Sequence, residues 1–200
     1  MRLRNGAAAV AVTCGLAVTG IAGAGAAQAV TPTTAAVKSA PHKSVQQMSL
    51  QQMLDVVRHQ VQSSYPAATL MVAAGDSPSG KTKDMSKVTD WQLVYNTNDS
   101  SSEIQSVEVH ATLQGDIGKQ IPHTQPWGGV MAVRDEIGMT PEKAYSILQS
   151  AGYHDAYQYV SVVKPLVADA RLQYHFSNTP GGCDGYAVNV DNRAVNPICA

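Results

Sequence analysis

Histidines and carboxylates are the side chains most able to give this 200-residue chain a catalytic or metal site. None of the histidines has a ligand spacing such as His-Glu-x-x-His, so we predict no metal and no cofactor. Asp55 and His59 lie one helical turn apart and could form half of a general-base arrangement. No nucleophile motif accompanies them, so we predict no catalytic residue and interpret the pair as a solvated helix face. The histidines are His42, His59, His110, His123, His154 and His175.

Asp184 and Asp191 raise the question of a calcium site near the C-terminus. Calcium takes six to eight oxygen ligands, normally from several acidic side chains at short spacing. These two carboxylates are seven residues apart and have no third one nearby. We therefore expect Asp191 to stabilise a turn by accepting hydrogen bonds from backbone N–H groups.

The cysteines predict one disulfide and an oxidising compartment. Cys14 lies in an apolar leader, which leaves Cys183 and Cys199 as an even pair. If 186–190 and 194–198 form a hairpin around Asp191, the numbers of opposed residues sum to 382, and the two cysteines satisfy the same sum. They would then face each other, and closing a loop of this size is worth about 3 kcal/mol.

A proline- and glycine-rich segment is the most unusual stretch of the chain, and it reads Ile-Pro-His-Thr-Gln-Pro-Trp-Gly-Gly from residue 121. Tryptophan is enriched at binding hot spots, and functional residues concentrate on rigidly presented loops. His123, Gln125 and Trp127 are therefore the candidate binding loop. The alternative is that Trp127 is buried in the core, as tryptophan usually is.

The first 29 residues are typical of an export signal. Arg2 and Arg4 precede an uncharged run rich in alanine, glycine and valine, which ends in Ala27-Gln28-Ala29, a small-x-small cleavage site. The mature chain, with twelve basic and fifteen acidic side chains, has no basic cluster for nucleic acid or for anionic lipid. It also lacks an apolar run long enough to span a bilayer. We therefore predict a secreted protein with no membrane insertion after cleavage.

After a flexible tail over 30–48, the chain repeats one order of elements. A helix from Ser49, with Gln52 at the capping-box position, precedes three strands within 49–118. A connecting loop over 119–138 leads to a second helix, capped by Thr140 with Pro141 behind it, and to further strands within 139–200. The fold class predicted is α+β, with two helix-plus-antiparallel-meander units and a C-terminal disulfide-stapled hairpin. The repeated order is that of an internal duplication or of two ordinary units that happen to be alike.

The second unit resembles the PepSY domain family. The resemblance rests on Thr140-Pro141-Glu142-Lys143-Ala144, on Leu172-Gln173-Tyr174-His175-Phe176, and on Tyr186-Ala187-Val188-Asn189-Val190-Asp191 followed by Val195. It covers roughly 139–198. The chain departs from the family pattern in its cysteine pair and in Asn192-Arg193-Ala194, where the family usually has a glycine. PepSY domains occur in propeptides of secreted metallopeptidases and in cell-envelope proteins, so the resemblance implies a non-catalytic module that binds a protein or modulates a peptidase.

The sequence thus predicts a secreted, non-catalytic protein-binding module, with inhibition of a secreted peptidase as its sharpest form. Two alternatives stay open. One is a small hydrolase whose catalytic groups meet only in three dimensions, which a cleft with perturbed carboxylates or histidines would favour. The other is an envelope structural or glycan-binding protein, which a concave aromatic patch would favour. The partner and the oligomeric state are not predicted.

Overall fold

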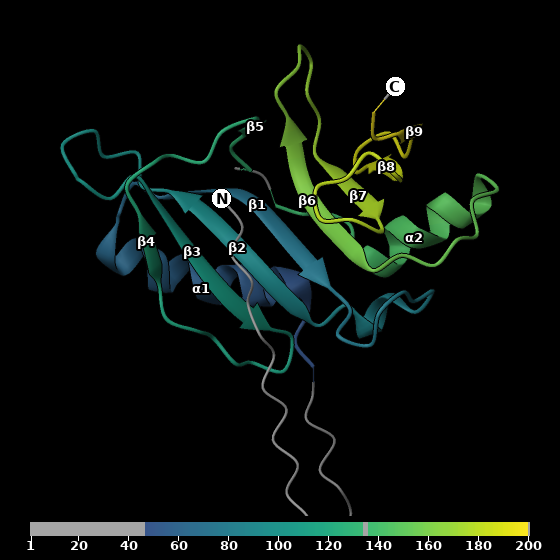
Figure 1. Cartoon of the computed structure of the whole chain (residues 1–200), viewed down its shortest axis with the longest axis horizontal. Coiled ribbons are helices and arrows are strands. Elements are labelled where there is room, and N and C mark those ends of the chain that lie inside the picture. The colour runs from purple at the N-terminus through teal and green to yellow at the C-terminus, as the bar shows by residue number, and fades with distance from the viewer. Residues whose placement is uncertain (1–46, 134–135, 200) are drawn as a thin grey trace, which may run out of the picture. The chain divides into compact units, whose positions relative to one another are not determined.

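Two α-helices, one short 3-10 helix and nine strands form the part of the chain that the structure describes (Figure 1). This computed structural model describes residues 47–133 and 136–199. The predicted leader over 1–29 and nearly all of the predicted tail over 30–48 lie outside these residues. The elements are α1 (Leu50–Ser64), β1 (Thr69–Asp76), η1 (Met85–Lys87), β2 (Asp90–Asn96), β3 (Ser106–Thr112), β4 (Ile121–His123), β5 (Val130–Met131), α2 (Pro141–Ser150), β6 (Tyr159–Pro165), β7 (Gln173–Ser177), β8 (Tyr186–Asn189) and β9 (Val195–Pro197).

Both helices begin where their capping residues predict. The Ser49 hydroxyl accepts a hydrogen bond from the backbone N–H of Gln52 at 3.2 Å, and the Gln52 side chain accepts from the backbone N–H of Ser49 at 2.8 Å. This is the complete capping box, and α1 ends just before Pro66. At α2, the Thr140 hydroxyl accepts from the backbone N–H of Lys143 at 3.3 Å. The two helix predictions are confirmed.

All nine strands belong to one antiparallel sheet. Its order is β4-β3-β2-β1-β6-β7-β8-β9, and β5 pairs with β6 outside this path. At the centre, β1 and β6 pair from Val72 opposite Val163 to Asp76 opposite Tyr159. Strands from the two halves of the chain are therefore direct neighbours.

This sheet corrects the predicted fold class. We expected an α+β protein made of two helix-plus-meander units, consistent with an internal duplication. The pairing of β1 with β6 instead gives a mainly-β fold with one nine-stranded sheet, to which two helices are added. The prediction was wrong because apolar alternation identifies strands but does not reveal which distant strand each one pairs with.

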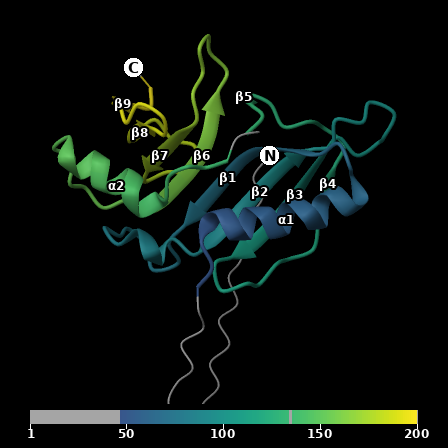
Figure 2. The same cartoon turned by 180° about the vertical axis from the view of Figure 1, so that it is seen from behind.

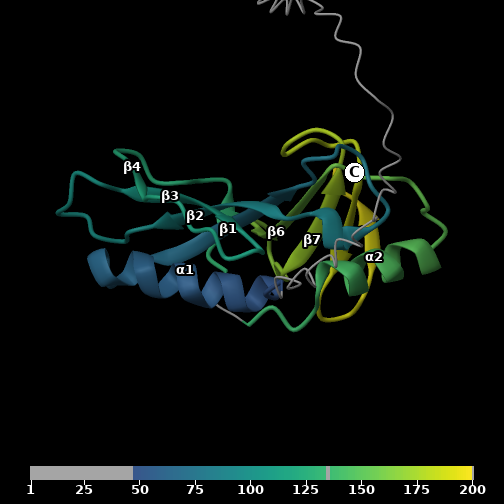
Figure 3. The ribbon, with the colours of Figure 1, turned by 90° about the horizontal axis from the view of Figure 1, so that it is seen from below.

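The helices cover one face of the sheet. Figure 2 shows α1 lying across β1, β2 and β3, and Figure 3 shows α2 on the same side. Side chains at alternate strand positions point to this face and join the helices in one core, in which Trp91, Tyr174 and Phe176 are almost fully buried. We call the opposite side of the sheet the open face. It carries the other strand positions, among them Ala74 and Ser161.

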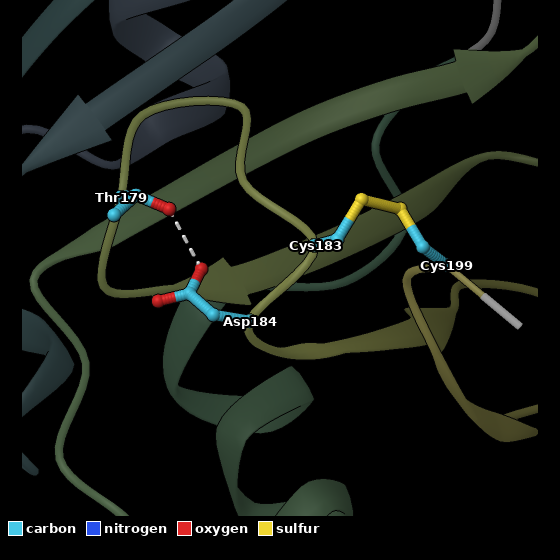
Figure 4. The surroundings of a disulfide bond; sticks show 4 residues. All are labelled: Thr179, Cys183, Asp184 and Cys199. Atoms are coloured by element: carbon cyan, nitrogen blue, oxygen red, sulfur yellow. Dashed lines mark hydrogen bonds between the residues drawn. A yellow bond between two sulfur atoms is a disulfide. The ribbon is translucent and has the colours of Figure 1, made fainter.

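The predicted disulfide is confirmed. Cys183 and Cys199 are bonded, with their Cα atoms 5.2 Å apart (Figure 4). The predicted register of the hairpin is off by one, because β8 and β9 pair with Ala187 opposite Asn196, so opposed numbers sum to 383. The extra residue is accommodated by the turn, where Arg193 has a positive φ of 61°.

The turn itself is stabilised by Asn189 rather than by Asp191. The Asn189 side chain accepts hydrogen bonds from the backbone N–H groups of Asp191 and Asn192 at 3.0 and 3.2 Å. Asp191 forms an ion pair with Arg171 at 3.6 Å. The role predicted for Asp191 is therefore filled by the asparagine two residues earlier, which makes the same kind of turn.

Candidate functional site

The predicted connecting loop contains a segment that crosses the end of the sheet. We call residues 121–131 the crossing segment. It starts as β4, which pairs with β3 and places His123 opposite Ser106. It ends as β5, which pairs with β6 and places Val130 opposite Pro165. The next residues return to β1, because the backbone N–H of Val133 donates to the carbonyl of Leu70 at 2.7 Å. The segment thus runs from one sheet edge to the junction of β1 and β6.

Side chains from the strand ends hold the middle of the crossing segment. The Ser106 hydroxyl donates to the carbonyl of Gln125 at 2.7 Å. Asn96 makes two hydrogen bonds to Trp127: its amide oxygen accepts from the backbone N–H at 2.7 Å, and its amide nitrogen donates to the carbonyl at 3.0 Å. These bonds mimic a strand pair and fix the backbone of Trp127 in place.

The Trp127 side chain is 44 % exposed, so the alternative of a core position is wrong. His123 and Gln125 are also exposed. His123 lies 3.4 Å from the Glu108 carboxylate, whereas Trp127 is held through Asn96. The structure therefore places the three predicted residues on one segment and presents the indole on a fixed backbone.

Other large apolar side chains are exposed close to β5. Met131 is part of β5, and Leu166 and Val167 follow Pro165, the last residue of β6, which pairs with Val130 of β5. Their exposed fractions are 39 %, 68 % and 63 %. Together with Trp127 they form what we call the apolar rim. Isolated exposed apolar residues are normal, but a concentration of them on adjoining segments is typical of interaction sites.

A row of valines on the side of the sheet away from the helices is buried next to Val130 of the crossing segment. Val72, Val94 and Val163 come from β1, β2 and β6 and form a small apolar cluster separate from the main core. Val130 of the crossing segment packs against this cluster at one side, and Ala74 packs against it at the other. The cluster thus connects the crossing segment to the middle of the sheet.

Beyond Ala74, the open face is hollowed into a cleft of about 400 Å³. We call it the acidic cleft. Asp76 of β1 lies directly opposite Asp90 of β2 and opposite Tyr159 of β6. Thr112 of β3 lies opposite Asp90 on the far side. The cleft is lined by Ala74, Gly75, Asp76, Asp90, Trp91, Gln92, His110, Ala111, Thr112, Tyr159, Val160, Ser161, Ser177, Pro180 and Gly181.

The two aspartates make the cleft electronegative. Burial, followed by the neighbouring charge of Asp90, raises the pKa of Asp76. Among the described residues, neither carboxylate forms an ion pair with a lysine or an arginine. Two like charges on directly opposed strand positions repel each other, so the cleft favours a cationic group.

A third carboxylate extends this charge towards the sheet edge. Burial acts to raise the pKa of Glu108, but hydrogen bonds from Gln92 and His110 and the charges of His110 and His123 lower it overall. The His110 ring nitrogen Nε2 lies 2.6 Å from one oxygen of Glu108. Glu108 is thus an anion that is already partnered, in contrast to the aspartates of the cleft.

The acidic cleft was not predicted from the sequence. Its signal is present in part, because Asp90 and Gln92 alternate with buried residues along one strand, and His110 and Thr112 do so along the next. Such alternation places each pair on one face. Asp76 and Tyr159 could not be assigned to the same cleft from the sequence, because that requires knowing that β1 pairs with both β2 and β6.

The other candidates stay apart. Asp55 pairs with Arg58 at 3.5 Å, and His59 is exposed on the same helix. Asp184 accepts a hydrogen bond from the Thr179 hydroxyl at 2.8 Å (Figure 4). Within residues 47–133 and 136–199, no group of three or more histidines, cysteines or carboxylates could hold a metal ion. In the same ranges, no helix is long and apolar enough to cross a membrane.

No family model, curated protein or solved structure matches this chain. The resemblance of 139–198 to PepSY domains therefore stays a prediction.

Proposed function

We propose that this protein is an extracellular, non-catalytic binding module whose protein partner docks on the open face. The exposed Trp127, with its backbone fixed by Asn96, is the observation that carries the proposal. A rigid aromatic side chain gives a large contact area at little entropic cost, which is why tryptophan dominates binding hot spots. The other side chains of the apolar rim, Met131, Leu166 and Val167, supply further apolar contact area.

Two features support an extracellular site of action. The Cys183–Cys199 disulfide persists in oxidising compartments and is rare in the cytosol. The first 29 residues have the composition of an export signal. Inhibition of a secreted peptidase is the sharpest form of the proposal, and its support is the resemblance to PepSY domains.

The test is capture of a partner from the culture fluid of the source organism. The bait is oxidised protein comprising residues 30–200, which contains the whole compact unit Lys43–Ala200. Trp127→Ala removes the proposed anchor. Val56→Ala is the matched control, because Val56 is 47 % exposed and lies on α1, on the other side of the sheet.

We expect the wild type and the Val56 variant to retain the same protein and the Trp127 variant to lose it. Capture by all three baits, or by none, would overturn the proposal. Titration of thermolysin-like, subtilisin-like and papain-like peptidases with the same three proteins tests the sharper form. Stoichiometric inhibition that depends on Trp127 supports it, and digestion of the bait without inhibition contradicts it.

A further inference from the structure

The connection between β6 and β7 carries the most exposed apolar side chains of the described chain. Leu166 and Val167 are consecutive on it and have the two largest exposed fractions among the large apolar residues within 47–133 and 136–199. Figure 1 shows this connection projecting beyond the neighbouring strands, at the top of the view. We call residues 166–170 the β6–β7 tip. It presents its apolar side chains on a projecting part of the surface.

Contacts with two different neighbours hold the base of the β6–β7 tip. On one side, the last two residues of β6 pair with β5. On the other side, Arg171 forms an ion pair with Asp191 at 3.6 Å. The carbonyl of Leu172 accepts a hydrogen bond from the backbone N–H of Val190 at 2.9 Å. The tip thus rises from a base that is fixed on both sides.

A tight turn closes the β6–β7 tip. The backbone N–H of Ala170 donates to the carbonyl of Val167 at 3.2 Å, and Asp169 between them has a positive φ of 57°. This is the hydrogen bond of a β-turn, and aspartate is one of the few residues that adopt a left-handed conformation readily. The turn and the fixed base restrict the conformations of the tip, so little conformational entropy is lost when a partner binds it.

The shape and charge of the β6–β7 tip select the surface that covers it. A projecting tip holds two flat surfaces apart, so it fits a partner with a hollow. A lipid surface is disfavoured, because Asp169 is the only charged residue of the tip and the mature chain has no basic cluster. The acidic cleft of a second copy is also disfavoured, because an apolar side chain there would desolvate Asp76 and Asp90. An apolar pocket on another protein suits the tip best.

The substrate clefts of endopeptidases are hollows of this kind. Such a cleft takes up a chain segment and places one side chain in a specificity pocket, which is apolar in chymotrypsin and contains an aspartate in trypsin. The β6–β7 tip offers such a segment, because Leu166 directly follows Pro165, where β6 ends. Complexes of peptidases with protein inhibitors form with little change in the backbone, which a fixed tip favours.

We infer that the β6–β7 tip enters the substrate cleft of a secreted endopeptidase and that Leu166 fills its apolar specificity pocket. The inference rests on the proposed function and specifies the inserted segment and the class of partner. Met131 and Trp127, on the adjoining crossing segment, then contact the peptidase outside the pocket. The anchoring role of Trp127 is thereby kept.

Titration of peptidases with tip variants tests the role of Leu166. Oxidised protein comprising residues 30–200 is added to subtilisin, chymotrypsin or thermolysin, which accept apolar side chains, and to trypsin, which accepts cationic ones. Hydrolysis of a small peptide substrate is followed, and gels show whether the added protein stays intact. Leu166→Lys places a charge where the apolar side chain is proposed to bind. Val56→Lys is the matched control, because it adds the same charge at an exposed position on α1.

We expect the wild type to inhibit at least one of the first three enzymes stoichiometrically and not to inhibit trypsin. Leu166→Lys should raise the inhibition constant about 100-fold, as the loss of a central anchor does. Leu166→Met keeps an apolar side chain and should raise it by less than about tenfold. Val56→Lys should leave it unchanged. Absence of inhibition by the wild type, equal inhibition of trypsin, or full inhibition by Leu166→Lys would overturn the inference.

Capture from culture fluid separates this inference from the proposed function. If the Leu166→Lys bait retains the wild-type partner undiminished and the Trp127→Ala bait loses it, the tip is not the inserted segment and the proposed function stands. If the Trp127→Ala bait retains the partner undiminished, the proposed function itself is refuted. Thermal unfolding of each variant, compared with the wild type, shows that the sheet has kept its fold.

Discussion

Protonation of His175 should destabilise the fold as the pH falls below neutrality. His175 is half-buried at the centre of β7, opposite Ser161 on one side and Ala187 on the other. Its Nε2 lies 3.0 Å from the side-chain oxygen of Gln173, which can only accept, so this nitrogen carries the proton of the neutral ring. Burial lowers the pKa of His175 to about 4 from its usual 6.5, because the charged imidazolium loses hydration.

The sign and size of the effect follow from linkage. Between pH 6.5 and 4 the unfolded chain binds a proton at this histidine and the folded chain does not, so stability is complete above pH 6.5 and falls as the pH drops towards 4. A shift of this size corresponds to about 3 kcal/mol in total, of which about 2 kcal/mol is lost between pH 7 and pH 5. These values are upper limits, since the ring keeps some contact with water.

Urea unfolding at pH 7 and pH 5 measures this loss. His175→Gln keeps a polar side chain but removes the titrating group, so its free energy of unfolding should fall less between the two pH values, by up to about 2 kcal/mol. His154→Gln, at an exposed position, should behave like the wild type. Equal pH dependence in the wild type and the His175 variant would refute the assignment of the loss to this buried ring.

Three further substitutions test the packing, the disulfide and a helix cap. Serine at both Cys183 and Cys199 should lower the free energy of unfolding by about 3 kcal/mol, and reduction of the wild type should lower the urea midpoint equally. Gly75→Ala places a methyl group 2.8 Å from the Trp91 ring in the core, which should cost about 1–3 kcal/mol and alter the near-ultraviolet dichroism. Thr140→Ala removes the cap of α2 and should cost about 1 kcal/mol in thermal unfolding, whereas Thr140→Ser should not.

Local features of the chain were predictable and long-range ones were not. The capping residues Ser49 and Thr140 define where the helices begin, because a cap acts within four residues of the chain. The cysteine pair was also predictable, although the hairpin register was off by one residue. That register depends on the conformation of Arg193, whose left-handed φ has no clear signal in an arginine side chain.

The same distinction between local and long-range features applies to the candidate site. The composition of the crossing segment drew attention to Trp127, but its exposure depends on Asn96, which lies 31 residues earlier in the chain. The residues next to Trp127 in the sequence do not indicate whether its side chain is buried in the core or exposed on a backbone that a distant strand holds in place. The hydrogen-bonding partner decides the outcome, and that partner is set by the tertiary fold.

The corrected fold class has a direct consequence for function. In two separate helix-plus-meander units, β1 and β6 would each be an edge strand, and Asp76 would have Asp90 on one side and solvent on the other. In the single sheet, Tyr159 takes that open position, and the valine cluster spans the junction with Val72 and Val163 on either side. The acidic cleft and its connection to the crossing segment therefore exist only because the halves share one sheet. The open face, on which we propose that a partner docks, is a property of the whole sheet, and neither half of the chain could form it alone.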